Sequence, residues 1–356
     1  MRLEEPAWWY RDGGSVAETL LRPAGAVWGA IATRAFARAT PYRARYPVIC
    51  VGNFTAGGTG KTPLALLIAA ELKRLGRRPS FLTRGYGGRV AGPHWVDAER
   101  DSAADVGDEP LLLARAAPTL VARDRAAGAR AIEDDARSAD IIVMDDGLQN
   151  ATLAKDLVLA VVDGQRGLGN RRVMPAGPLR APLEFQLGLA DAIIVNGAPP
   201  VASPRGDVAD WLRQRFPGSV LSAGVRPSGS TTWLENAAVV GYAGIGAPER
   251  FFELLGQLGA KLVETVRFPD HHRFSEADAE RLLGLAARSS ALLVTTEKDW
   301  ARIEGSTGAK ARLRSASRPL PVSMVLDERD QGRLVALLEM VIKDGGAATS
   351  SARSQS

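Results

Sequence analysis

A glycine-rich loop between an apolar strand and a helix constrains the fold of this 356-residue chain more than any other feature. The preceding run, YPVICVGN at 46–53, is β-branched and apolar, and the following segment from Thr62 to Leu75 has helical spacing and ends at Gly76. The loop itself consists of Thr55, Ala56, Gly57, Gly58, Thr59, Gly60, Lys61 and Thr62. A strand, such a loop and a helix, in this order, are typical of a phosphate-binding loop.

The loop residues suit the contacts that the phosphates of a nucleotide require. Glycines allow backbone N–H groups to converge on phosphate oxygens, and the following helix adds its positive N-terminal end. We predict that Lys61 reaches the β- and γ-phosphates and that the Thr62 hydroxyl binds Mg²⁺. Thr55 replaces the glycine with which the strict motif begins. The competing interpretation is a glycine-rich turn with a solvated lysine.

A pair of acids follows another apolar run, because IIVM at 141–144 leads into Asp145 and Asp146. Carboxylates at the carboxyl edge of a parallel sheet can reach the Mg²⁺ of a bound nucleotide, so we predict that both contribute to a metal site. Strand ends also carry Asp simply as a turn former. The phosphate acceptor stays open at this point, and water, a protein and a small or lipid hydroxyl are all compatible.

Apolar runs alternating with helical patterns predict an α/β fold with two domains. The first domain, 46–228, is a P-loop NTPase-like parallel sheet covered by helices, with strands expected at 80–83, 119–122, 140–144, 157–163 and 191–196 and helices at 109–116 and 124–133. Pro/Gly/Ser-rich stretches at 198–206 and 226–231 place a boundary near 225–235.

The second, smaller α/β domain is predicted to span 229–343. Its strands are expected at 237–242, 261–266, 290–295 and 320–325, and its helices near 248–257, 276–288 and 330–343. Ser275 and Asp278 resemble a capping box that opens the middle helix. Residues 344–356 are small and polar, which predicts a disordered tail.

Composition narrows the class of protein. Hydrophobic residues make up 46% and charged residues 24%, which is typical of a globular chain. The single cysteine, Cys50, forms no internal disulfide and fits a reducing compartment, and three histidines argue against a histidine-rich metal site. The sequence shows neither a membrane-spanning run nor a secretory signal. The net charge of +5 permits an anionic partner, and we predict no nucleic-acid partner.

Several further motifs give the chain a family resemblance. They are, in order, VGNFTAGGTGKTP at 51–63, RGYGG at 84–88, GDEP at 107–110, DDGLQ at 145–149, MPAGPLR at 174–180, GIG at 244–246, FPDHHRF at 268–274 and TEKD at 296–299. Together they resemble the tetraacyldisaccharide 4′-kinase family, from about residue 8 to 340. The resemblance implies transfer of the γ-phosphate of ATP, with Mg²⁺, to the 4′-hydroxyl of a tetraacyldisaccharide 1-phosphate, forming lipid IVA. It also implies a peripheral enzyme on the cytoplasmic face of the bacterial inner membrane, and we expect no obligate protein partner.

The resemblance also implies roles for individual residues. Asp108 and His271 would form the pair that activates the acceptor hydroxyl, and an imidazole oriented by a carboxylate suits that task. Glu109 would support the metal site, while substrate or phosphate contacts are implied for Arg84, Gln149 and Arg180. The TEKD motif would lie near the nucleotide base or ribose. Without the resemblance, Asp108 and Glu109 indicate a helix start and His271 a loop histidine.

Two positions depart from the family pattern. Asn150 follows DDGLQ where the family usually has histidine, so a proton-transfer role for that side chain cannot operate here. Ala181 follows Arg180 where an acid is usual. Neither position belongs to the phosphate-binding loop or to the predicted Asp–His pair, so we interpret both as variation around the site.

Residues 1–45 are predicted to form an amphipathic membrane-contact segment. Apolar side chains recur at helical spacing at Leu20, Leu21, Ala24, Val27, Trp28, Ile31 and Ala35. A basic flank is formed by Arg22, Arg34, Arg38, Arg43 and Arg45, and Trp8, Trp9 and Tyr10 add aromatic groups that favour a membrane interface. The alternative is an N-terminal amphipathic helix that packs on its own domain.

Two other classes of P-loop protein were weighed against a lipid kinase. A membrane-associated partition- or positioning-type ATPase has a similar loop but carries a lysine before the two glycines, where this chain has Ala56. A metallochaperone GTPase would require a Cys/His metal cluster and an N-K-x-D motif, and neither occurs. The sequence therefore favours the lipid kinase.

Overall fold

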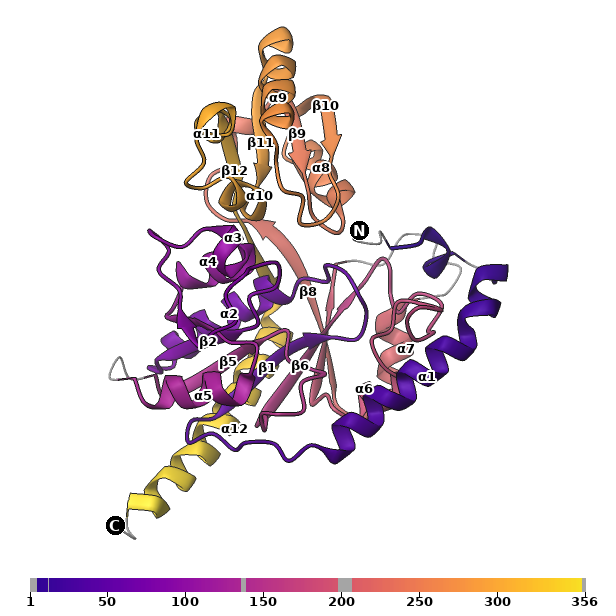
Figure 1. The fold of residues 1–356 in the computed structure, drawn as a ribbon, viewed down its shortest axis with the longest axis vertical. Coiled ribbons are helices and arrows are strands. Elements are labelled where there is room, and N and C mark those ends of the chain that lie inside the picture. Colours follow the sequence, from indigo (N-terminus) through magenta and orange to yellow (C-terminus); the bar gives the residue numbers. More distant parts are fainter. Residues whose placement is uncertain (1–4, 12, 136–138, 198–206, 354–356) are drawn as a thin grey trace.

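The computed structural model describes residues 5–11, 13–135, 139–197 and 207–353. Its larger unit is a nine-stranded sheet with the strand order β13-β8-β7-β6-β1-β5-β2-β4-β3 (Figure 1). The strands are β1 (Val48–Asn53), β2 (Pro79–Thr83), β3 (His94–Trp95), β4 (Thr119–Val121), β5 (Ile141–Asp145), β6 (Leu157–Asp163), β7 (Ala192–Asn196), β8 (Ser219–Pro227) and β13 (Val322–Leu326). Neighbouring strands are parallel except at the two ends of the sheet, where β3 and β13 are antiparallel to their partners.

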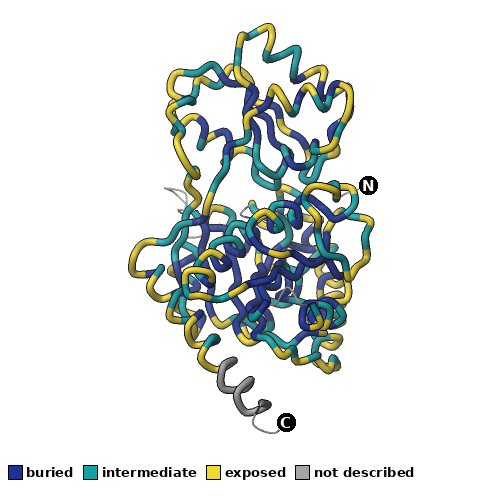
Figure 2. Tube along the Cα trace, turned by 90° about the vertical axis from the view of Figure 1, so that its left-hand side faces the viewer, coloured by how far each residue is buried: buried dark blue, intermediate teal, exposed yellow. Residues whose placement is uncertain are grey.

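Helices cover both faces of this sheet, as the continuous apolar runs predict. They are α2 (Lys61–Arg74), α3 (Ala103–Val106), α4 (Asp108–Ala114), α5 (Arg125–Glu133), α6 (Leu183–Leu187), α7 (Val208–Arg215) and α12 (Glu328–Arg353). Every residue of β1 is buried, and its side chains alternate between two clusters. Val48 and Cys50 pack on one face, whereas Ile49 and Val51 pack on the other against α2. Figure 2 shows the buried residues running through the middle of the unit.

The smaller unit is a four-stranded parallel sheet with the order β10-β9-β11-β12. Its elements are β9 (Ala238–Ala243), α8 (Pro248–Gln257), β10 (Lys261–Arg267), α9 (Glu276–Ser289), β11 (Leu292–Thr296), α10 (Glu297–Arg302), α11 (Gly308–Ala316) and β12 (Ser317–Leu320). The predicted capping box at Ser275 and Asp278 is confirmed. The central strand β9 buries Tyr242, whose hydroxyl donates to Ser317 Oγ at 2.8 Å.

The structure differs from the predicted span 229–343 at its C-terminal end. The strand expected at 320–325 is divided, because Leu320 ends β12 whereas Val322–Leu326 pairs with β8 in the large sheet. The following helix buries Leu334 and Leu338 in the same cluster as Ile49. The chain therefore leaves the large sheet after β8 and returns to it at β13, because these apolar side chains find their partners there.

Two further expectations about segments need revision. Strand β8 continues to Pro227 and so includes the start of the stretch expected as a linker at 226–231, while the linker expected at 198–206 lies outside the described residues. The tail expected to be disordered at 344–356 continues α12 as far as Arg353. Extending an existing helix requires no new nucleation, and this stretch contains no proline. Residues 354–356 lie outside the described part of the chain.

The N-terminal helix α1 (Val16–Arg38) lies along the outside of the large unit (Figure 1). Its inner face contains two buried glycines, Gly25 and Gly29, and a Cβ atom at Gly25 would lie 2.7 Å from the carbonyl oxygen of Val173. Pro182 limits the space at Gly29 in the same way. Small residues thus allow α1 to approach closely, so its larger apolar side chains are not required for packing.

Candidate functional site

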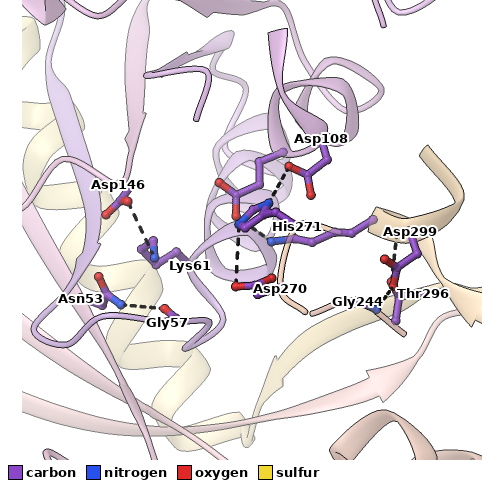
Figure 3. Close-up of polar contacts among 12 residues, drawn as sticks. Asn53, Gly57, Lys61, Asp108, Asp146, Gly244, Asp270, His271, Thr296 and Asp299 are labelled. Atoms are coloured by element: carbon purple, nitrogen blue, oxygen red, sulfur yellow. Dashed lines mark hydrogen bonds and ion pairs between the residues drawn. The ribbon is translucent and has the colours of Figure 1, made fainter. Parts of the chain in front are cut away.

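The predicted phosphate-binding loop connects β1 to α2, as the sequence indicates, and two asparagines hold it in shape. Asn53 Nδ2 donates to the carbonyl oxygen of Gly57 at 3.3 Å (Figure 3), and Asn196 Nδ2 donates to that of Thr59 at 3.0 Å. Gly60 precedes the helix with φ +102°, and a Cβ atom there would lie 2.5 Å from Asn196 Nδ2. Only glycine fits this position without strain, so the backbone is shaped as an anion cradle.

Lys61 and the acid Asp146 face each other at the edge of this loop. The Lys61 ammonium lies 3.9 Å from Asp146 Oδ2, and Arg180 Nη1 donates to Asp146 Oδ1 at 2.8 Å (Figure 3 shows the lysine contact). Burial alone would raise the pKa of Asp146, but the charges of Lys61 and Arg180 outweigh it and lower the pKa to about 2. Arg180 Nε also donates to the carbonyl oxygen of Thr55 at 3.2 Å. Arg180 therefore holds both the Asp146 carboxylate and the backbone of the phosphate-binding loop at Thr55.

Asp145, at the end of β5, has a different environment. It is fully buried, and neither carboxylate oxygen has a hydrogen-bond partner. Burial first, and then the charges of Glu109 and Asp146, raise its pKa to about 7. A buried carboxylate without a donor, at the end of the strand that pairs with β1, fits a divalent cation, since oxygen ligands are those that Mg²⁺ prefers. The residues present therefore fit a nucleotide with Mg²⁺, although no group of three acids or histidines is preassembled among the described residues.

The two members of the predicted Asp–His pair meet across the boundary between the two units. His271 Nδ1 lies 3.1 Å from Asp108 Oδ1, and His271 Nε2 lies 3.8 Å from Asp270 Oδ2 (Figure 3). Asp108 opens α4 and its side chain is 5% exposed, while His271 follows β10 with φ +56°. Burial opposes ionisation of Asp108, yet the hydrogen bond from His271 and the charge of Arg302 hold its pKa well below the usual range.

The charge of Glu109 is balanced by a lysine of the TEKD motif, which was expected near the base or ribose of a nucleotide. Lys298, from the TEKD motif on α10, donates to Glu109 Oε1 at 2.6 Å. Burial would raise the pKa of Glu109, but Lys298 lowers it, and the same contact raises the pKa of Lys298. The motif expected near the base or ribose of a nucleotide is therefore engaged with an acid of the large unit.

Two of the predicted substrate positions, Gln149 and Arg84, and the departure at Asn150 have other surroundings. Gln149 Nε2 donates to the carbonyl oxygen of Asn53 at 2.8 Å and to Gln186 Oε1 at 2.7 Å, so it supports the scaffold. Arg84 is exposed at the end of β2. Asn150 Oδ1 accepts from the backbone N–H of Thr152 at 3.1 Å, which is a turn contact.

Sequence reasoning missed two buried arginines at the site. Arg302 contacts Asp108, and Lys298 and Arg302 stand four residues apart, so their shared helix face was a signal available in the sequence. Arg125 is 3% exposed and its Nη1 donates to the carbonyl oxygen of Ala122. Burial lowers the pKa of Arg125 to about 10. Its position depends on packing between β4 and α5, which no local pattern encodes.

Two of the aromatic residues expected at a membrane interface, Trp9 and Tyr10, donate hydrogen bonds to other parts of the chain. Trp9 is 8% exposed, and its Nε1 donates to the carbonyl oxygen of Pro175 at 3.2 Å. Tyr10 donates to Glu5 Oε2 at 3.0 Å, and Glu5 lies so close to the loop that a Cβ atom at Gly57 would collide with it. Trp9 and Tyr10 therefore join the N-terminal segment to the site.

The family model described as tetraacyldisaccharide-1-P 4′-kinase matches residues 17–343. The chain belongs to this family. The tetraacyldisaccharide 4′-kinase of Methylorubrum extorquens is 50% identical over 86% of this chain and 91% of its own length, and that of Nitrobacter winogradskyi is 47% identical over 92% and 94%. LpxK from Aquifex aeolicus, crystallised in complex with ATP, has the same fold, with a TM-score of 0.69 at 23% identity over 91% of this chain and 99% of that one.

Family membership confirms the resemblance on which the predicted fold and activity depend. The partition-type ATPase, which was the leading alternative, is not favoured. The roles of individual site residues remain predictions, because family membership does not assign them one by one.

Proposed function

We propose that this chain uses Asp108 and His271 to activate the 4′-hydroxyl of a tetraacyldisaccharide 1-phosphate for attack on the γ-phosphate of ATP. The enzyme is an ATP-dependent kinase of lipid A biosynthesis, as its family indicates. The observation that supports the residue assignment most strongly is the Asp108–His271 contact of 3.1 Å between segments 163 residues apart. A carboxylate and an imidazole brought together across two units are suited to general base catalysis.

Each part of the site has a task in this reaction. The loop N–H groups and Lys61 would bind the phosphates of ATP, while Thr62, Asp145 and Asp146 would hold Mg²⁺, with Glu109 supporting their charge balance. Bound Mg²⁺ supplies charge neutralisation at the transferred phosphoryl group. The ionised Asp108 accepts the Nδ1–H of His271, which leaves Nε2 to take the proton from the 4′-hydroxyl as the oxygen attacks. The proton moves to Nε2, the new P–O bond forms, and ADP departs.

Labelling identifies the acceptor directly. The chain is incubated with γ-³²P-labelled ATP, Mg²⁺ and separate acceptors: a tetraacyldisaccharide 1-phosphate, its deacylated form, other glycolipids and soluble sugars. We expect label only in the acylated disaccharide, at the 4′ position. Release of labelled inorganic phosphate at the same rate in the absence of any acceptor would contradict a kinase and favour an ATPase.

The outer face of α1 supports binding to a membrane surface, where an acylated acceptor resides. Five large apolar side chains are exposed along it, with Val16 78%, Leu20 74%, Val27 61%, Trp28 50% and Ile31 58% exposed. The spacing of these residues places them on one side of the helix, opposite its buried glycines. No helix among the described residues is long and apolar enough to cross a bilayer. We place the enzyme peripherally on the cytoplasmic face of the inner membrane.

Vesicle sedimentation tests the membrane surface. A triple variant with Leu20, Val27 and Ile31 changed to Ser is expected to lose most of its co-sedimentation with anionic phosphatidylglycerol vesicles, since it removes the apolar contact. A matched control changes two exposed apolar residues elsewhere, Val263 and Met340, to Ser. Undiminished pelleting of the triple variant, or equal loss in the control, would contradict this surface.

A further inference from the structure

Arg302, the last residue of α10, lies between the two units at the point where Asp108 meets His271. Its side chain is 6% exposed, and both Nε and Nη2 donate to Asp108 Oδ2, at 3.0 and 2.5 Å. Nη2 also lies 3.4 Å from His271 Nδ1. The guanidinium therefore contacts both members of the pair, although it belongs to neither of their elements.

The smaller unit holds this guanidinium in place by itself. Arg302 Nη1 donates to the carbonyl oxygen of Gly244 at 2.5 Å and to Asp299 Oδ1. Asp299 is fully buried, and its other oxygen accepts from the backbone N–H of Gly244 at 3.0 Å and from Thr296 Oγ1 at 2.7 Å (Figure 3). One edge of the guanidinium is thus fixed within its own unit, and the opposite edge is presented to the large unit as a fork for a carboxylate.

This fork determines which oxygen of Asp108 faces the imidazole. A carboxylate has two equivalent oxygens and rotates unless both are engaged. Arg302 occupies Oδ2, so Oδ1 is left for His271 Nδ1. With Oδ2 engaged by two N–H groups of Arg302, Oδ1 is the acceptor that faces the imidazole, which favours the proton of His271 on Nδ1 rather than on Nε2.

We propose that Arg302 is a positioning residue that orients Asp108, and through it the tautomer of His271, when the two units close on each other. The inference rests on the proposed role of the Asp108–His271 pair. Arg302 is held by Asp299 and the carbonyl oxygen of Gly244, and its effect on the reaction passes through Asp108. The pair would then be competent only when α10 lies against α4.

Kinetics of matched variants test this role. Arg302→Met is expected to lower kcat about tenfold with ATP KM nearly unchanged, because the base is misoriented while the phosphate-binding loop is untouched. Arg302→Lys should recover part of the loss. The control is Arg115→Met, which removes a different ion pair between the same regions, to Glu304 at 3.0 Å, and should keep kcat. In an Asp108→Asn background, Arg302→Met should cause no further loss.

A spectroscopic measurement separates this inference from the proposed reaction. The chain has only three histidines, so the imidazole ¹⁵N signals of labelled protein are assignable with His94 and His272 variants. Wild-type enzyme and Arg115→Met should show His271 protonated at Nδ1, and Arg302→Met should lose that signature. An unchanged His271 tautomer in Arg302→Met, or a further additive loss of kcat in the Asp108→Asn background, would overturn the inference. Absence of acceptor labelling by the wild-type enzyme would instead contradict the proposed reaction, whatever the tautomer.

Discussion

Two pairs of consecutive acids lie at the site, and they are neutralised in different ways. Asp108 and Glu109 are each matched by a cation of the smaller unit, Arg302 and Lys298. Asp145 and Asp146 depend on the large unit, where Asp146 is paired and the buried oxygens of Asp145 have no donor. Both acids of the first pair have a cation as partner, whereas the second pair includes a carboxylate that no protein group engages. This difference supports the proposed division, in which Asp108 acts on the acceptor while Asp145 and Asp146 serve the metal and nucleotide.

The largest effect is expected on the nucleotide side of this comparison. Lys61→Ala should lower turnover by about 10³-fold, because it removes the charge that faces Asp146 and the phosphates. The measurement is acceptor labelling at saturating ATP, together with ATP affinity, which should also fall. Lys73→Ala, on the exposed end of the same helix, is the control and should retain activity. Full activity of Lys61→Ala would remove the loop from the mechanism.

The acceptor side should respond differently. Asp108→Ala and His271→Ala are each expected to lower kcat by about 10²-fold with little change in ATP affinity, because both act on the acceptor hydroxyl. The double variant should be no slower than the slower single variant, as expected for two groups that act as one unit. Parallel loss of ATP binding in both single variants would erase the distinction between the two acid pairs.

Asp145, whose carboxylate oxygens have no hydrogen-bond partner, is expected to make the stability of the fold depend on pH. The raised pKa of Asp145, about 7, means that the folded chain holds a proton that the unfolded chain releases near pH 4. The contribution of Asp145 to stability is therefore present below about pH 4 and is lost as the pH rises through 7. Asp145→Asn should show a higher Tm than wild type at pH 8 and a similar Tm at pH 4, without nucleotide or metal.

Addition of Mg²⁺ with ATP sharpens that measurement. Binding at Asp145 should raise the Tm of the wild-type chain at pH 8 by more than that of Asp145→Asn, because ligands stabilise the state to which they bind. A Tm difference between the two chains that is independent of pH would argue that Asp145 is ionised and paired in solution.

The smallest effect is expected from a contact between the units that does not involve the Asp–His pair. Arg250 Nε donates to Gln165 Oε1 at 2.9 Å, and its guanidinium also pairs with Asp163 at the end of β6. Arg250→Met should raise the KM for ATP about threefold and leave kcat nearly unchanged, because closure is weakened while the Asp–His pair stays intact. A loss of kcat as large as that of Asp108→Ala would show that the two contacts are not separable.

The sequence was sufficient for features encoded by contiguous residues. The loop 55–62, the acids at the end of β5 and the alternation of strands and helices all depend on local patterns, and each lies where those patterns indicate. The family resemblance predicted the Asp108–His271 contact, which local patterns could not supply because the residues stand 163 positions apart. The return of β13 to the large sheet was missed, since a short apolar strand does not specify its partner.

The spacing of Lys298 and Arg302 gives them a shared helix face, but it does not identify the acids with which they pair. Nothing in TEKD indicates that Lys298 pairs with Glu109, because that contact depends on how α10 packs against α4. The outward orientation of Leu20 and Val27 agrees with the predicted membrane-contact segment, although the sequence left packing on its own domain open as the alternative. An amphipathic pattern gives the same signal whether its apolar face packs inward or outward, and the glycines of the opposite face decide between them.

The most direct test of the account is a crystal structure of the chain with Mg²⁺, a non-hydrolysable ATP analogue and the acylated disaccharide 1-phosphate. We predict that the 4′-hydroxyl lies within hydrogen-bonding distance of His271 Nε2 and in line with the γ-phosphorus, with His271 Nδ1 still on Asp108. A 4′-hydroxyl bound to a different base, with His271 separated from Asp108, would contradict the account.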